Sequence, residues 1–336
     1  MLVPGSIPNI ILSLVTIIIC LKNSILYKYI NLLSRFTIGA VAVWFIYTKL
    51  NADFIDNLNE IKFNDLNLSF LIMTMILLFV NWGVEALKWR FAIQDIHNIS
   101  FIKALMLTFT GITIGLLTPN RIGEIPARAA LLKSDSFKEV ILKTIASSFS
   151  QVVITFLMGG LGLMLTQEYF HLGLDFMFLN ILVVVGLVIL FLLYFNMKKL
   201  APLFQKIKVL KNEKLIKALM DISIKELFIL LMYSLLRYFV FFIQYWLVLK
   251  AFGLELGTVT ELFLIPVCFL IASSIPTILI SEIGVRGSVA LFVFGFVSDL
   301  DIQIILASIV LWLINVALPA IFGLYDLKEL KLLRDK

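Results

Sequence analysis

Long apolar runs dominate this sequence and constrain its fold more than any other feature. A bilayer presents about 30 Å of hydrocarbon, and backbone polar groups inside it must be satisfied within the segment. Candidate spans, with a shorter run at 288–298, lie at 36–50, 66–90, 101–118, 139–166, 174–195, 226–250, 258–280 and 302–325. The alternating segments of a membrane β-barrel are absent. We therefore predict an all-α polytopic membrane protein with about seven to nine hydrophobic helices.

The composition excludes several other classes. Charged residues make up 15% of the chain, against about 25% in soluble domains, so a water-exposed surface is not expected. The two cysteines, Cys20 and Cys268, are far apart in apolar runs, which argues against a disulfide framework. With His97 and His171 as the only histidines, we predict no His-rich metal site and no cofactor. The net charge of +6 lies in short loops, so it sets orientation and does not indicate nucleic acid.

The loop charges predict an orientation. Segment 196–226 carries eight lysines against three acids, and the tail after Tyr325 is also basic. Segment 51–65 carries four acids and one lysine. Since basic loops stay on the cytoplasmic side, we place the C-terminus in the cytoplasm of a multi-pass cell (inner) membrane protein.

The same orientation leaves two segments that cannot simply cross. Segment 101–138 begins and ends on the cytoplasmic side, and 258–298 begins and ends outside. Each contains a central proline, Pro119 or Pro276. We predict two proline-broken re-entrant hairpins that enter from opposite faces, as in pseudo-inverted repeats whose binding site lies near the midplane.

One membrane domain is the simplest division of the chain. We expect an N-terminal anchor and cytoplasmic linker at 1–34, the transmembrane domain at 35–325 and a cytoplasmic tail at 326–336. The apolar run 7–21 is open to three interpretations: an anchor, an extra span or a removed signal.

The first break reads Thr118-Pro-Asn-Arg-Ile-Gly-Glu124 and continues to Arg128. Arg121, Glu124 and Arg128 would share one face of a helical return arm. Pro119 and Gly123 allow a tight reversal, and the arginine fork suits phosphate oxygens.

The second break contains Pro276 and then Glu282-Ile-Gly-Val-Arg-Gly-Ser288. Glu282 and Arg286 are four residues apart and are expected to pair. Gly284 is the expected hairpin break. Both breaks thus combine proline, glycine, glutamate and arginine in apolar surroundings.

The first motif resembles the TPxRxGE signature of the lysylphosphatidylglycerol synthase/flippase transmembrane-region family. The second resembles that family's GGxGxRE motif, although Ser281-Glu282 replaces the glycine pair and Gly287 replaces the final acid. The resemblance spans roughly 35–325 and implies a fold with two re-entrant elements that handles polar lipids. It also implies no aminoacyl transfer, because the soluble transferase domain of the bifunctional members has no counterpart in these residues.

Six charged residues form the predicted site for a lipid headgroup: Arg121, Glu124, Arg128, Arg237, Glu282 and Arg286. Charges at bilayer depth are costly, so they indicate function or a structural ion-pair network. By contrast, Glu85 with Lys88 is expected to be a surface pair near the inner interface. Ser147, Ser148, Ser150 and Gln151 are expected to bond between helices, or to line a headgroup path.

Two functions fit these features. The first is a flippase-like protein that binds a polar or charged phospholipid and moves it between leaflets, not an enzyme. The second is a non-transporting scaffold or subunit that presents lipid to a separate lipid-modifying enzyme. Membrane lipid is the expected partner in both, with a homo-oligomer possible.

Overall fold

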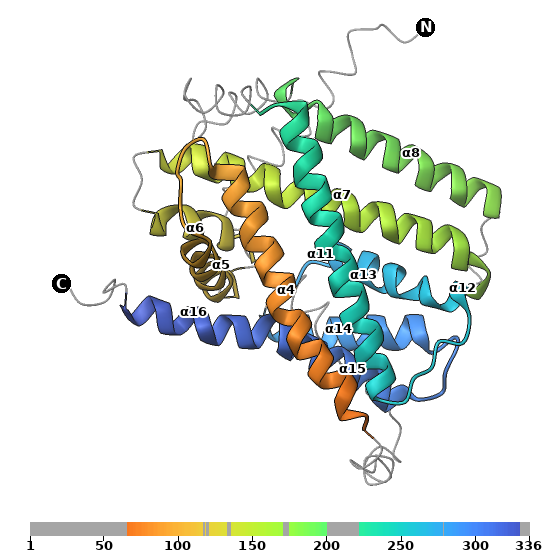
Figure 1. Cartoon of the computed structure of the whole chain (residues 1–336). Helices are drawn as coiled ribbons and strands as arrows, with labels where there is room; N and C mark the ends of the chain where they lie inside the picture. The colour runs from red at the N-terminus through yellow and green to blue at the C-terminus, as the bar shows by residue number, and fades with distance from the viewer. Residues whose placement is uncertain are drawn as a thin grey trace, which may run out of the picture.

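The fold is entirely helical in the residues that the computed structural model describes, which are 66–116, 118, 121–132, 136–170, 175–199, 222–277 and 279–329. The helices (Figure 1) are α4 (Leu68–Ile93), α5 (Phe101–Leu116), α6 (Glu124–Leu131), α7 (Phe137–Phe170), α8 (Phe176–Phe195), α11 (Ile224–Ala251), α12 (Val259–Leu262), α13 (Leu264–Ser274), α14 (Leu279–Phe294), α15 (Asp301–Trp312), the π-helix η4 (Leu313–Ala317) and α16 (Leu318–Glu329). The all-α prediction is confirmed. The predicted span at 36–50 and the segment 1–34 lie outside these residues, so the proposed division into domains stays a prediction.

Within the described ranges, five helical segments are long and apolar enough to cross a bilayer. They are Leu68–Ile93, Phe137–Phe170, Phe176–Phe195, Ile224–Ala251 and Asp301–Leu324. At about 1.5 Å per residue, the shortest of them, with 20 residues, reaches about 30 Å. The predicted spans at 66–90, 139–166, 174–195, 226–250 and 302–325 each coincide with one of these helices.

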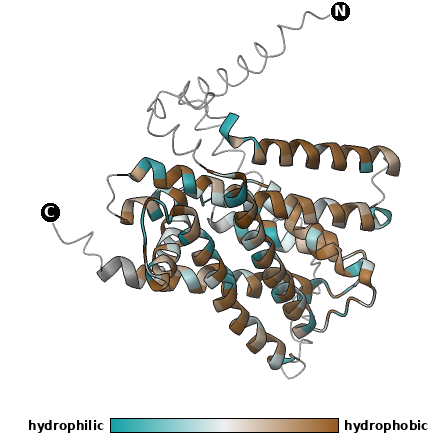
Figure 2. Ribbon diagram, turned by 45° about the horizontal axis from the view of Figure 1, so that its top comes forward, coloured by the Kyte–Doolittle hydropathy of each residue, from teal (hydrophilic) through white to brown (hydrophobic). Residues whose placement is uncertain are grey.

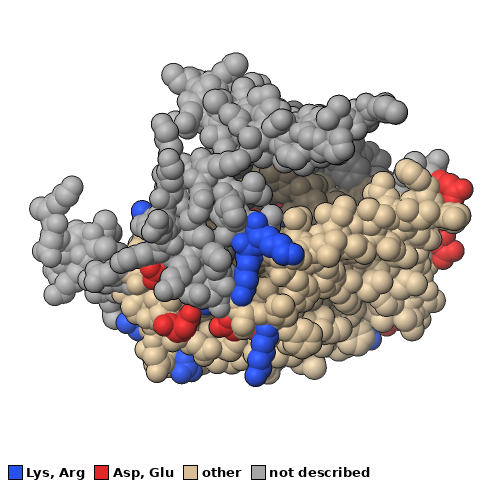
Figure 3. All heavy atoms as spheres, turned by 90° about the horizontal axis from the view of Figure 1, so that it is seen from above, with Lys and Arg blue, Asp and Glu red and all other residues tan. Residues whose placement is uncertain are grey.

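Helix α8 shows what solvent surrounds the protein. Its mean hydropathy is 3.1, yet only 6% of its best window is buried within the structure. Figure 2 shows it as an almost uniformly hydrophobic helix at the edge of the molecule. In Figure 3, charged side chains are few on the described surface and leave broad uncharged areas between them. A helix that is apolar on all sides and little buried by protein faces lipid.

The helices pack in a reciprocal pattern. Helices α4 and α11 pack against each other and run side by side across the molecule (Figure 1). Around them, α5 packs against α16 from the other half of the chain, and α13 packs against α7 from the first half. Each half therefore supports the short helix of the other, as expected for related repeats with exchanged contacts.

Two helix pairs take the place of the predicted hairpins. Helix α5 contacts α6, and α13 contacts α14. With 16 and 8 residues in the first pair and 11 and 16 in the second, no arm reaches the about 30 Å of a full crossing.

The breaks lie before the second helix of each pair. Pro276 lies between α13 and α14, whereas Pro119 lies outside the described residues. Gly123 is the N-cap of α6, and a Cβ there would lie 2.6 Å from Thr118 Cγ2, so only glycine fits this close approach. The assignment of Gly284 as a break was wrong: it lies inside α14, because helix formation resumes at Leu279.

Glycines set the distance between α7 and α13. A Cβ on Gly162 would lie 2.8 Å from the Phe263 carbonyl oxygen, a backbone atom that cannot rotate away. We expect Gly162→Ala to lower the free energy of unfolding by about 1–3 kcal/mol, because the helices must separate. Gly186→Ala is the matched control: α8 offers nothing within 4 Å of that Cβ, so no loss is expected. Thermal unfolding in detergent compares the two, and equal melting temperatures would contradict the close packing.

A π-helix interrupts the last span. Pro319 has no amide N–H, so the carbonyl of Asn315 loses its normal helical donor. The chain adapts by a wider turn at Leu313–Ala317, in which the Leu318 N–H donates to the Leu313 carbonyl oxygen. Such bulges are frequent at functional sites. Here the π-helix contains Asn315, whose buried side chain belongs to the site described next.

Candidate functional site

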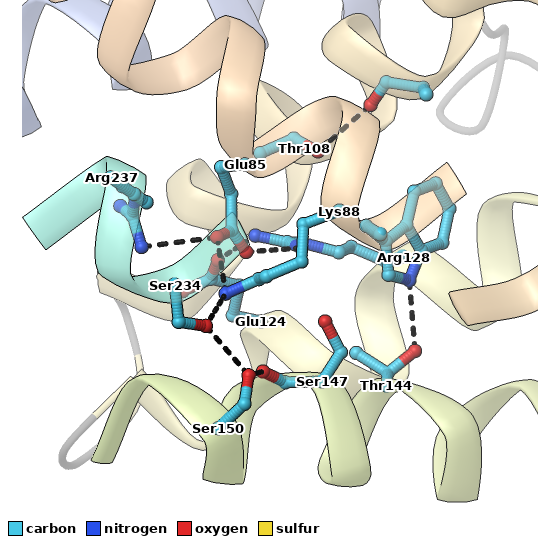
Figure 4. A network of polar contacts seen from close by, with 12 residues as sticks. Glu85, Lys88, Thr108, Glu124, Arg128, Thr144, Ser147, Ser150, Ser234 and Arg237 are labelled. Carbon is cyan, nitrogen blue, oxygen red and sulfur yellow. Dashed lines mark hydrogen bonds and ion pairs between the residues drawn. The ribbon is translucent and has the colours of Figure 1, made fainter. Parts of the chain in front are cut away.

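A buried ion network centres on Glu85 in α4 (Figure 4). Glu85 Oε2 lies 2.8 Å from Lys88 Nζ and 3.1 Å from Arg237 Nη1, and its Oε1 lies 3.1 Å from Arg128 Nη1. Arg128 also pairs with Glu124 one turn earlier in α6. The acid thus joins α4, α6 and α11 through three cations.

The prediction that Glu85 and Lys88 form a surface pair was wrong. Their side chains are 7% and 1% exposed. The sequence places them close to the end of an apolar run, but α4 continues to Ile93, and α5, α7 and α11 pack against it. The sequence did contain a sign of burial, because two charged residues, Glu85 and Lys88, lie within one turn of an otherwise apolar helix.

Polar side chains on α7 and α11 extend this network. Lys88 Nζ lies 3.5 Å from Ser234 Oγ, which is 2.7 Å from Ser150 Oγ. The Trp89 indole donates to Thr144 over 2.9 Å. Ser150 therefore bonds between helices, as expected for the polar residues of α7.

Arg128 fits because the facing residue on α5 is glycine. A Cβ at Gly111 would lie 2.7 Å from Arg128 Cγ. The side chain is 3% exposed, and its guanidinium is 5.8 Å from the centre of the Trp89 ring. Arg128 is thus a buried structural cation, although the sequence placed it in the headgroup site.

A second ion cluster joins the two helix pairs. Glu282 Oε1 in α14 accepts from Arg121 Nη2 at 2.6 Å and from Arg286 Nη2 at 2.9 Å. The expected pairing of Glu282 with Arg286 is present. Arg121, Glu124 and Arg128 do not share one helical face as predicted. Arg121 pairs with Glu282, whereas Glu124 and Arg128 belong to the Glu85 network.

Arg121 has a strained backbone. Its φ of 54° lies in the left-handed region, and it is the only non-glycine residue with positive φ in the described chain. This conformation costs of order 1–3 kcal/mol and is concentrated at functional sites. This left-handed conformation, just before α6, directs the Arg121 side chain toward Glu282.

Arg237 is held from two sides. Its Nε donates to Asn81 Oδ1 at 3.0 Å, and its guanidinium stacks 4.8 Å from the centre of the Trp82 ring. Asn81 in turn donates to Asn315 Oδ1 at 2.8 Å and to Gln244 at 3.3 Å. The π-helix therefore takes part in fixing the position of Arg237.

The two ion clusters border one cavity of about 230 Å³. Arg121, Arg237 and Arg286 line it, with side-chain exposures of 23%, 20% and 32%. Glu85 and Glu282 lie behind them at 7% and 8% exposure. No acidic residue belongs to the described lining. The cavity wall is therefore cationic, because the counter-charges are buried behind it.

The remaining lining combines polar, aromatic and aliphatic side chains. It comprises Asn81, Trp82, Gln151, Thr155, Tyr238, Phe241, Tyr245, Cys268, Phe269, Ala272, Ser273, Ser308, Leu311, Trp312, Asn315 and Val316. These residues come from α4, α7, α11, α13 and the helix that begins at Asp301. A cationic wall with a few polar groups in an otherwise apolar cavity is a typical ligand-binding arrangement.

Comparison of the chain with known protein families identifies one family. Residues 32–323 match the model of the lysylphosphatidylglycerol synthase TM region. The chain belongs to this family. Among curated proteins, no relative matches it.

Membership in the lysylphosphatidylglycerol synthase TM-region family confirms the resemblance drawn from the two motifs, and it makes the chain a multi-pass membrane protein concerned with lipid handling. The matched range contains both ion clusters and all of the cavity lining. Of the six predicted site residues, Arg121, Arg237 and Arg286 line the cavity, and Glu124, Arg128 and Glu282 do not.

Proposed function

We propose that this protein binds the headgroup of a charged phospholipid in the cavity and moves the lipid between leaflets. The observation that carries the proposal is the lining by Arg121, Arg237 and Arg286 without a described acid. Guanidinium groups bind phosphate oxygens through charge-assisted hydrogen bonds, which are strong where water is scarce. A cation-lined space inside a membrane protein is a default functional site.

The size of the cavity supports headgroup binding with the acyl chains left in the bilayer. Its volume of about 230 Å³ equals about eight water molecules and is below the about 300–1,000 Å³ of pockets for drug-sized ligands. A phosphate with a small substituent fits, whereas two acyl chains do not.

The broken helix pairs favour movement over static presentation. Each cluster that borders the cavity includes residues from the second helix of a short pair, α6 or α14, and these pairs pack on opposite halves of the chain. Transporters with inverted repeats place their sites at such elements and expose them to alternate sides. Within the proposal, the C-terminus is cytoplasmic, the membrane is the cell (inner) membrane, and the chain catalyses no reaction.

Lipid exchange in proteoliposomes tests the proposal. Phospholipids labelled on an acyl chain are reconstituted with the protein, and the label that a membrane-impermeant reductant can reach is followed over time. We expect exchange above that of protein-free vesicles. If no phospholipid exchanges, the scaffold alternative, in which lipid is presented to a separate enzyme, is favoured.

A single variant links exchange to the cavity. We expect Arg237→Gln to slow exchange at least threefold, because it removes one lining cation. Folding is retained, since Glu85 and Glu124 keep Lys88 and Arg128 as partners. Arg90→Gln is the matched control, because Arg90 lies at the end of α4 outside the lining. An equal rate in both variants would separate the activity from this cavity.

A further inference from the structure

The cavity lining also indicates which headgroups it accepts. An ammonium group placed in it would face three lining arginines, whereas the two acids that pair with them, Glu85 and Glu282, are 7% and 8% exposed and do not line the cavity. A phosphate in the same place gains attraction from all three. Since electrostatic interactions are strong where water is scarce, a headgroup that carries an amine is disfavoured even if it also carries a phosphate.

The arginines keep hydrogen-bond donors for an anion. Arg121 uses Nη2 for Glu282, Arg286 uses Nε and Nη2 for the same acid, and Arg237 uses Nε and Nη1 for Asn81 and Glu85. At least one nitrogen of each guanidinium is thus uncommitted to the described residues. Three planar donor groups around one space match the several oxygens of a phosphate.

Neutral polar groups at the cavity wall also lack partners. The indole nitrogens of Trp82 and Trp312, the Tyr238 hydroxyl and Gln151 Oε1 have no hydrogen-bond partner among the described residues. Trp82, Tyr238 and Trp312 are buried, with 5%, 3% and 8% of their surface exposed. An indole N–H only donates, Gln151 Oε1 only accepts, and a hydroxyl does both. Ligand hydroxyl groups, each with one donor and two acceptor positions, have the chemistry to pair with these groups once their side chains rotate toward the cavity.

We infer that the substrate is a phospholipid whose headgroup is anionic and bears neutral hydroxyl groups, as a glycerol or sugar phosphate does, and that a headgroup with a free amine is rejected. This inference rests on the proposed function. It implies that lysylphosphatidylglycerol, the lipid in the family's name, is a poor substrate for this chain.

A headgroup comparison in proteoliposomes tests the inference. The full chain is reconstituted into phosphatidylcholine vesicles with one acyl-labelled lipid at a time: phosphatidylglycerol, lysylphosphatidylglycerol or phosphatidic acid. We expect phosphatidylglycerol to exchange at least tenfold faster than lysylphosphatidylglycerol. Equal or faster exchange of the lysyl lipid would overturn the inference and leave the proposed function intact. Absence of exchange for all three would instead count against the proposed function.

Two tryptophan variants test the hydroxyl contacts. Trp312→Phe keeps an aromatic side chain but removes an unpartnered N–H at the wall, so exchange of phosphatidylglycerol should fall at least threefold more than that of phosphatidic acid. Trp246→Phe, outside the lining, should change neither. An equal fall for both lipids in Trp312→Phe would overturn the assignment of hydroxyl recognition.

A soluble ester tests the source of the headgroup chemistry. Vesicles loaded with radiolabelled glycerol 3-phosphate should retain it in the presence of the protein. Release as fast as phosphatidylglycerol exchange would overturn the lipid assignment, because the cavity would then carry the free phosphate ester.

Discussion

Glu85→Gln should destabilise this protein by about 3–5 kcal/mol, the largest loss expected from a single substitution at the site. Glutamine keeps the shape of the side chain but removes the charge that three cations share. Lys88, at 1% exposure, would then lie in the protein interior with Ser234 as its remaining polar partner among the described residues. Removing one member of a buried ion network costs more than the network contributes, because the remaining charges stay unpaired.

The free energy of unfolding in mixed micelles, titrated with denaturing detergent, measures this loss. Glu168→Gln is the matched control, since Glu168 is exposed near the end of α7, and a change within about 0.5 kcal/mol is expected. If Glu85→Gln fails to fold, Glu85→Gln with Lys88→Met should restore folding, because it removes the cation most dependent on Glu85. A double variant no more stable than the single one would refute the charge balance.

The second large effect is on activity. We expect the triple variant Arg121→Gln, Glu282→Gln and Arg286→Gln to fold but to exchange anionic lipid more than tenfold more slowly. Replacing a whole buried ion cluster by neutral groups is often close to neutral for stability, because desolvation of the charges is also avoided. The cavity meanwhile loses two of its three lining cations.

This variant separates function from structure at the second cluster. If the cluster served only to join α6 and α14, neutral hydrogen bonds would maintain the joint and exchange would persist. Glu282→Gln alone provides the comparison: it leaves Arg121 and Arg286 without their shared acid and should be less stable than the triple variant. Wild-type exchange rates in the folded triple variant would assign the cluster a purely structural role.

The sequence predicts the fold class, and three of the six residues that it assigns to the headgroup site line the cavity, for physical reasons that can be named. Apolar length determines α4, α7, α8 and α11 because a bilayer leaves no other way to satisfy the backbone. Proline and glycine residues in the sequence indicated the breaks near Thr118 and Pro276. Glu282 and Arg286 were paired correctly because the spacing of four residues is set by the helix itself.

The errors concern contacts between distant segments. Glu85 was assigned to the surface because its depth depends on where α4 ends and on the helices that cover it. Arg121 was grouped with Glu124, since helical spacing carries no sign of the left-handed turn that sends it to Glu282. Pro319 is the sequence feature that indicates the π-helix containing Asn315. The contact of this helix with Arg237 could not be predicted, because it is made through Asn81, which is far away in the sequence.

The reciprocal packing of α5 on α16 and of α13 on α7 has a consequence for how the chain is made. Synthesis runs from the N-terminus, so α5 and α7 enter the membrane before the helices that cover them exist. The face of α5 that packs on α16 must wait in the insertion machinery or in lipid until Leu318–Glu329 emerges, and the face of α7 that packs on α13 must wait until Leu264–Ser274 emerges. Assembly is therefore a late step, and the cationic cavity is completed only after Val316, the most C-terminal of its described lining residues, has been made.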